Sequence, residues 1–191
     1  MSSSSPAQPD VATRFKANVV GLAGNFKAIN NSAIQKGYNF VRREIAVFVE
    51  LYLSRLDPKD LLRTFVEHSY TYWSEIANRD NAFFDQHAES VFNLDAVVDA
   101  DLKAVIGDTR NVVLFRQLLT CQEVVTEQDK LLFWNYFETM VRICWKAILE
   151  DEARKEGDVN FWISREMRDK VLSIDNIETI IAKIEARKTK K

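Results

Sequence analysis

The stretch LLFWNYFETMVRICWKAIL (Leu131 to Leu149) decides the fold, because most of its positions are apolar. Its polar residues recur at steps of three or four, so a helix would place them on one narrow stripe: Asn135, Glu138, Thr139, Arg142 and Lys146. A helix that is apolar over most of its circumference has to be covered on several sides. We therefore predict that this segment is the central helix of the domain.

Both ends of the predicted central helix carry capping residues. Thr126 and Asp129 have the spacing of a capping box, in which the threonine oxygen accepts from a backbone N–H of the first turn and the acid reaches back. Lys155 and Gly157 suit the other end, where a cation meets the negative helix terminus and glycine adopts a positive φ. The helix is thus expected from Thr126 to Glu156, about 45 Å long at ~1.5 Å per residue.

Composition favours a helical bundle around this segment. The 191 residues include only five glycines and three prolines, too few for an architecture of short strands and tight turns. We predict an all-α fold, a single-domain bundle of about seven to nine helices, some of them packed at the usual antiparallel angles. Residues 1–9 are expected to form a disordered tail, residues 10–186 the helical domain, and residues 187–191 (RKTKK) a solvated basic tail.

Apolar periodicity and capping residues predict where the other helices begin and end. Asp10 is expected to cap a first helix, and Asn30 to Ser32 to interrupt it. A second helical pattern then runs to Asp57 and Pro58, which stop it and start the next. The cluster from Asn78 to Asn81 predicts a turn, and the last helix is expected to begin near Asp175.

Residues 103–115 admit two interpretations. The segments KAVI and NVVLF, joined by GDTR, could form a β-hairpin, since valine and isoleucine favour strands. Apolar spacing of three and four continues across both flanks, however, and this favours helix.

Few residues have the chemistry of a catalytic or metal site. The two histidines, His68 and His87, stand apart, and His68 among aromatic residues is more typical of a structural position than of a general base. Cys121 and Cys144 form no CxxC pair and show no zinc-ligand spacing. Phosphate-binding loops and nucleophile elbows do not occur in the sequence. We therefore expect no catalytic residues, no metal and no cofactor.

Charge is unevenly distributed along the chain. The segment from Val11 to Arg43 contains no acidic residue, whereas the chain from Glu44 onward carries 20 basic and 27 acidic residues. The segment contains six basic residues: Arg14, Lys16, Lys27, Lys36, Arg42 and Arg43. It could be a partner-binding arm, or it could lie on the acidic body of the same chain. Because aromatic residues are interleaved with these charges, nucleic acid is the alternative partner.

A second candidate contact element lies near the C-terminus. Isoleucines recur there at steps of three, four and three: Ile174, Ile177, Ile181 and Ile184. Such a seam can close the chain's own bundle or enter a groove on another protein.

The sequence also favours a soluble intracellular protein. Its longest apolar runs are far shorter than the roughly 20 residues of a membrane span. Residues 1–10 are polar and lack the apolar run of a secretory signal. Two unpaired cysteines suit a reducing compartment.

Two aromatic-rich stretches resemble a group of viral proteins. HSYTYWSEIANRDNAFF (His68 to Phe84) and DKLLFWNYFETM (Asp129 to Met140) are similar to segments of small, mostly uncharacterised all-helical proteins of nucleocytoplasmic large DNA viruses. The resemblance implies a structural or assembly role in a virion or in infected host cytoplasm, and it implies no catalytic residue. We therefore predict a non-enzymatic component that binds a protein partner or itself, with nucleic-acid binding through the basic segment as the alternative.

Overall fold

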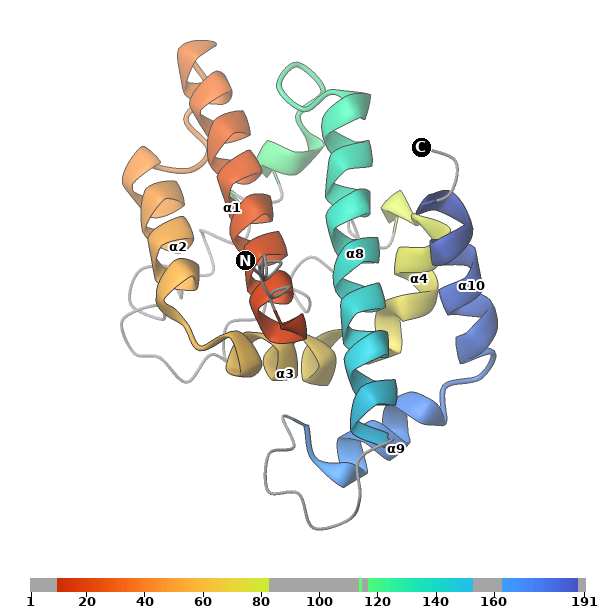
Figure 1. The fold of residues 1–191 in the computed structure, drawn as a ribbon. Coiled ribbons are helices and arrows are strands. Elements are labelled where there is room, and N and C mark those ends of the chain that lie inside the picture. The colour runs from red at the N-terminus through yellow and green to blue at the C-terminus, as the bar shows by residue number, and fades with distance from the viewer. Residues whose placement is uncertain (1–9, 83–113, 115–116, 153–162, 189–191) are drawn as a thin grey trace, which may run out of the picture.

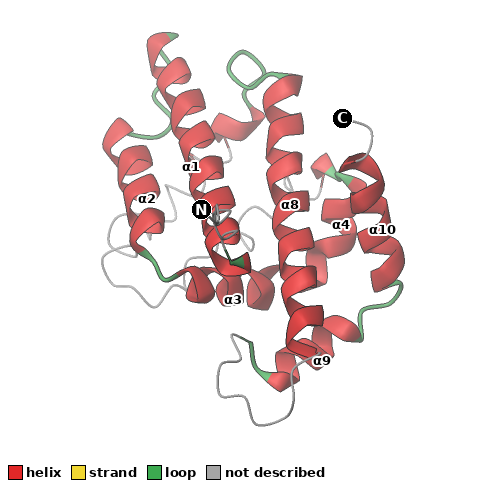
Figure 2. Ribbon diagram, viewed as in Figure 1, coloured by secondary structure: helices red, strands yellow, loops and turns green. Residues whose placement is uncertain are grey.

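The computed structural model describes residues 10–82, 114, 117–152 and 163–188, and the regular elements in these ranges are all helical (Figures 1 and 2). This confirms the predicted all-α fold. The elements are α1 (Val11–Gln35), α2 (Arg43–Arg55), α3 (Pro58–Ser69), the 3-10 helix η1 (Tyr70–Tyr72), α4 (Trp73–Asn78), α8 (Glu127–Glu152), α9 (Arg165–Leu172) and α10 (Ile177–Lys188).

The predicted capping residues begin three of these helices. The Asp10 carboxylate accepts from the Thr13 N–H at 2.9 Å, and this backbone hydrogen bond lowers the pKa of Asp10. Asp57 accepts from two N–H groups of the first turn of α3, which has Pro58 at its first position. At the start of α8, Thr126 N–H donates to Asp129 Oδ2 at 2.8 Å and Asp129 N–H donates to Thr126 Oγ1 at 3.2 Å. The capping box is therefore confirmed.

Helix α8 lies between α1 on one side and the α4 and α10 pair on the other (Figure 1). Its cover is incomplete, because Leu131, Leu132 and Leu149 remain 36–42% exposed. The apolar circumference of α8 is thus buried mainly along the sides that meet these three helices.

Two clusters of buried side chains hold the helices together. The larger cluster joins α3, α4, α8, α9 and α10, and it includes Phe15 from the first turns of α1. The smaller cluster joins the second half of α1 and the first half of α2 to residues 118–125. Helix α1 contributes to both clusters, so this basic helix is docked along its length.

The predicted interruption at Asn30 to Ser32 is wrong, because α1 continues to Gln35. Asn30 is fully buried, and its side-chain Nδ2 donates to the Val41 carbonyl at 2.9 Å. This bond ties α1 to the connection before α2 without breaking the helix. The turn instead occurs at Gly37, whose φ of +87° suits a residue without a Cβ.

Other predicted boundaries are met in part. The turn at Asn78 to Asn81 is confirmed, since α4 ends at Asn78 and Arg79 is left-handed with φ +54°. Helix α10 begins at Ile177 and continues to Lys188, so it extends into the segment expected as a solvated tail. The predicted end of the central helix beyond residue 152, and the helix-or-hairpin question at 103–115 apart from helical Leu114, lie outside the described residues.

Candidate functional site

Three lysines of the predicted basic segment bind acceptors on other parts of the same chain: Lys16, Lys27 and Lys36. The first donates to the Leu56 carbonyl at 2.7 Å, the second pairs with the Glu50 carboxylate on α2, and the third donates to the Glu123 carbonyl at 2.6 Å. These contacts support the interpretation of the basic segment as an internal electrostatic match.

The arginines of the same segment point to solvent. Arg14, Arg42 and Arg43 are exposed, and no hydrogen bond or ion pair joins their guanidiniums to another residue within the described ranges. Arg14 lies in the first turn of α1, whereas Arg42 and Arg43 follow the far end of that helix. At ~1.5 Å per residue, the length of α1 between these ends is about 30 Å. The three arginines therefore do not form one basic patch.

The isoleucine seam lies inside the bundle. Ile177, Ile181 and Ile184 are 1–8% exposed and belong to the larger core cluster, where α10 packs on α4 and α8. Of the two roles considered for this seam, closing the chain's own bundle is the one that the structure shows.

The residues considered for chemistry are scattered. His68 is exposed on α3, and His87 lies outside the described residues. Cys144 is buried in α8, and desolvation raises the pKa of its thiol well above the usual value. Cys121 is half-buried, with its thiol 3.2 Å from the Glu123 carboxylate. Within the described ranges, no three His, Cys, Asp or Glu side chains converge as metal ligands.

A buried ionic junction joins α4, α8 and α10, and the sequence patterns did not predict it. Glu138 belongs to the polar stripe of α8, yet it is only 5% exposed. Arg79 donates to it in bidentate fashion, from Nε to Oε1 at 2.8 Å and from Nη2 to Oε2 at 2.6 Å. Arg187 of α10 also donates to Oε1, and Asn135 accepts from Arg79 Nη2 at 3.0 Å.

The junction holds its carboxylate in the ionised state. Burial alone would raise the pKa of Glu138, but hydrogen bonds from Arg79 and Arg187 outweigh that effect and lower it. The bond to Glu138 in turn raises the pKa of Arg79. A carboxylate held ionised by two guanidiniums is suited to fastening helices and poorly suited to proton transfer.

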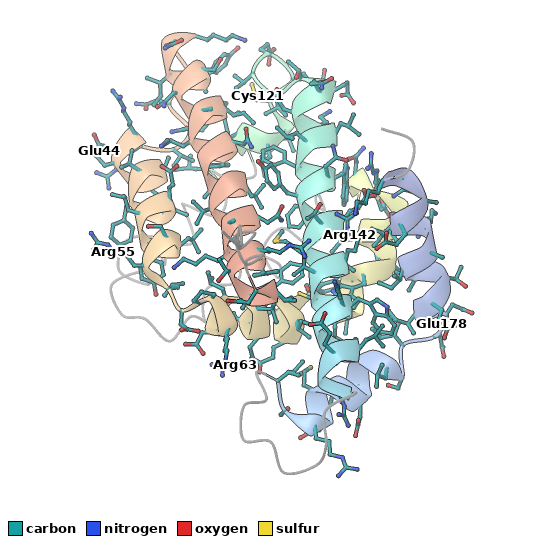
Figure 3. All side chains as sticks on the ribbon, in the orientation of Figure 1. Glu44, Arg55, Arg63, Cys121, Arg142 and Glu178 are labelled. Carbon is teal, nitrogen blue, oxygen red and sulfur yellow. The ribbon has the colours of Figure 1, made fainter. Side chains whose placement is uncertain are left out.

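Glu138 is a charged residue that lies in the interior, whereas helix α2 has apolar side chains on its outer side. Only Ile45 and Ala46 of this helix are buried, while Glu50 pairs with α1. Glu44, Phe48, Leu51 and Arg55 recur at steps of four, three and four, so they share the stripe opposite these inward positions. We call this stripe the α2 outer face. Figure 3 shows Glu44 and Arg55 at its two ends, on the side of α2 turned away from α1.

Leu51 is the centre of the α2 outer face. It is 51% exposed, the largest value among the large apolar side chains of the described residues. The neighbouring rings of Phe48 and Tyr52 stack on each other with centroids 6.0 Å apart, and both are half-buried. The sequence contains a signal for this exposed apolar surface. Apolar residues in FVELYL (residues 48–53) cover a wider part of the helix circumference than a single buried stripe.

No described helix has the length and hydropathy needed to cross a membrane. Comparison of the chain with protein-family models, curated proteins and solved structures finds no match.

Proposed function

We propose that the chain is a non-enzymatic protein-interaction component that binds another protein chain through the α2 outer face. The observation that carries the proposal is the half-exposed Leu51 beside the stacked rings of Phe48 and Tyr52. Contiguous exposed apolar patches larger than a few hundred Å² mark interaction sites on folded chains. Aromatic and large aliphatic groups that lose contact with water also supply most of the binding energy at protein interfaces.

The composition of this surface matches that of an interface. Its apolar centre is flanked by Glu44 and Arg55, both exposed. Interfaces commonly combine an apolar centre with a charged rim, in which the rim sets orientation and the centre sets affinity. The exposed leucines of α8, at Leu131, Leu132 and Leu149, are each less exposed than Leu51.

The resemblance of residues 68–84 and 129–140 to small helical proteins of large DNA viruses supports a more specific role. On that basis, the interaction belongs to the structure or assembly of a viral particle, or to a complex in infected host cytoplasm. An all-α fold built on two core clusters is compatible with such a role.

Nucleic-acid binding is the alternative function. Its strongest candidate residues are now Arg14, Arg42 and Arg43, because the lysines of the segment bind acceptors within the chain. Such binding would weaken steeply with salt and would be lost when all three arginines become alanine. Binding that is absent at low salt, or that survives the triple substitution, would exclude this alternative.

The proposal is tested by site-specific photo-crosslinking in the cells that produce the protein. A photoreactive phenylalanine analogue replaces Leu51 in one variant and Glu67 in the control, where Glu67 is an exposed residue of α3. We expect adducts heavier than the chain from position 51 and few from position 67. Equal yields from the two positions, or none from either, would overturn the proposal.

A further inference from the structure

The charges of the α2 outer face are arranged so that the surface complements itself. Glu44 lies in the first turn of α2 and Arg55 in its last turn. Phe48 and Leu51 lie between them, at equal distances from the middle of the helix. If two copies of α2 lie antiparallel across a two-fold axis at that midpoint, Glu44 of one chain meets Arg55 of the other, and Phe48 meets Leu51.

We propose that the partner on the α2 outer face is a second copy of this chain, bound through an antiparallel pair of α2 helices. The inference rests on the proposed function and names the partner for the same surface. Each dimer would contain the Glu44 and Arg55 contact twice, with Leu51 of both chains at the centre. A two-fold axis requires one surface to serve both partners, and this stripe meets that requirement in both charge and apolar content.

Among the described helices, α2 packs mainly on α1. Helix α2 lies at one edge of the described helices, with α1 on its inner side (Figure 1). The inner side is already occupied, since Ile45 and Val49 pack in the smaller core and Glu50 pairs with Lys27. A second copy can therefore approach the outer side without displacing a contact between α1 and α2.

The length of the contact between the two α2 helices determines the affinity that we expect for the dimer. Glu44 and Arg55 are eleven positions apart, which corresponds to about 17 Å at ~1.5 Å per residue. Two helices of this length bury less than the ~1,200 Å² at the low end of stable interfaces. We expect a weak, reversible dimer with a dissociation constant on the order of 10 to 100 μM.

Charge reversal gives a test specific to the antiparallel geometry. In a dimer of Glu44→Arg chains, arginine faces arginine twice, and in a dimer of Arg55→Glu chains, glutamate faces glutamate twice. Each variant alone should dimerise at least about tenfold more weakly than the natural chain. An equimolar mixture should form the heterodimer instead, because every facing pair in it is then of opposite sign.

The measurement is sedimentation equilibrium of the full chain over a concentration series that spans the expected constant. Leu51→Asp should weaken the dimer by about a hundredfold, and the control Glu67→Arg, a reversal on α3, should leave it unchanged. Glu44 and Arg55 also favour the helix dipole, so circular dichroism must show each variant folded. Glu44→Gln and Arg55→Gln serve as milder variants, each expected to weaken the dimer by a smaller factor.

Three outcomes would overturn the inference: a natural chain that stays monomeric throughout, a dimer that Leu51→Asp leaves intact, or a mixture that dimerises no better than its components. Crosslinking at position 51 distinguishes failure of the dimer proposal from failure of the proposed function, which is binding of any protein through the α2 outer face. If the natural chain is monomeric but position 51 yields adducts with a different protein, the interaction role stands and self-association is refuted. If position 51 yields no adduct, both are refuted.

Discussion

Substitution of Glu138 by glutamine tests whether the buried ionic junction fastens α4 and α10 to α8. The change keeps the volume of the side chain and removes its charge. Glu138 accepts from Arg79 and Arg187, which lie 59 and 49 positions away in sequence. Glutamine retains one acceptor oxygen but presents an amide N–H₂ where the other oxygen stood, so one guanidinium meets a donor in place of an acceptor.

The expected loss follows from the burial of the three side chains. Breaking a buried ion pair by removing one partner costs about 3–5 kcal/mol. The side chains of Arg79 and Arg187 are 21% and 29% exposed, so each can regain some hydration. We therefore place the loss at the lower end, about 3 kcal/mol of the free energy of unfolding. For a chain of this size, that loss corresponds to a fall in Tm of roughly 6–12 °C.

Thermal unfolding followed by circular dichroism at pH 7 measures this loss. The matched control is Glu150→Gln, the same change on the same helix, where the side chain is 48% exposed and lies 3.8 Å from Lys146. An exposed pair of this kind contributes less than about 1 kcal/mol. A fall in Tm of less than about 3 °C for Glu138→Gln, or an equal fall for the control, would refute the fastening role.

The pH dependence gives an independent check on the same residue. The pKa of Glu138 in the folded chain lies below its ordinary value of 4.5, so its charge stabilises the fold fully above that value. This contribution is lost as the pH falls through the lowered folded pKa. The difference in stability between the natural chain and Glu138→Gln should therefore be constant near neutral pH and shrink below about pH 4.5. A difference that grows on acidification would contradict this assignment.

Three further outcomes follow from local geometry. Gly37→Ala should lower the free energy of unfolding by about 1 kcal/mol in a urea titration, since φ is +87° there although a Cβ meets nothing within 4 Å. Gly24→Ala should raise it by up to ~1 kcal/mol, because this helical Cβ would meet only the movable end of Glu50 at 3.3 Å. In the folded chain, a thiol reagent should modify Cys121 and spare the buried Cys144, and mass spectrometry showing two modified thiols would contradict this.

Features that depend on neighbouring residues were predictable from the sequence. Asp10, Asp57 and Thr126 each begin a helix as expected, because a cap needs only a side-chain oxygen close to the free N–H groups of the next turn. The all-α fold was predictable for a similar reason, since helical periodicity is visible within one segment.

Features that depend on distant residues were not predictable. Asn30 resembles a helix breaker in sequence, but its amide finds the Val41 carbonyl and α1 continues past it. Arg187 resembles part of a solvated tail, but α10 extends far enough to bring it to Glu138. In each case a tertiary contact outweighs a local preference, and single-sequence patterns contain no information about that contact.

Because contacts between distant residues are not visible in the sequence, the side of α2 that faces solvent could not be predicted from it. A stripe of polar residues on α8 and a stripe of mixed residues on α2 look alike in sequence, because either stripe can face water or another helix. Arg79, which directly follows α4, and Arg187 of α10 hold Glu138 in the interior and stabilise its charge there. Helix α2, among the described elements, packs chiefly on α1, and Leu51 stays 51% exposed. Which stripe of a helix stays exposed thus depends on which other helices pack on it, and we propose that a second copy of α2 covers this one.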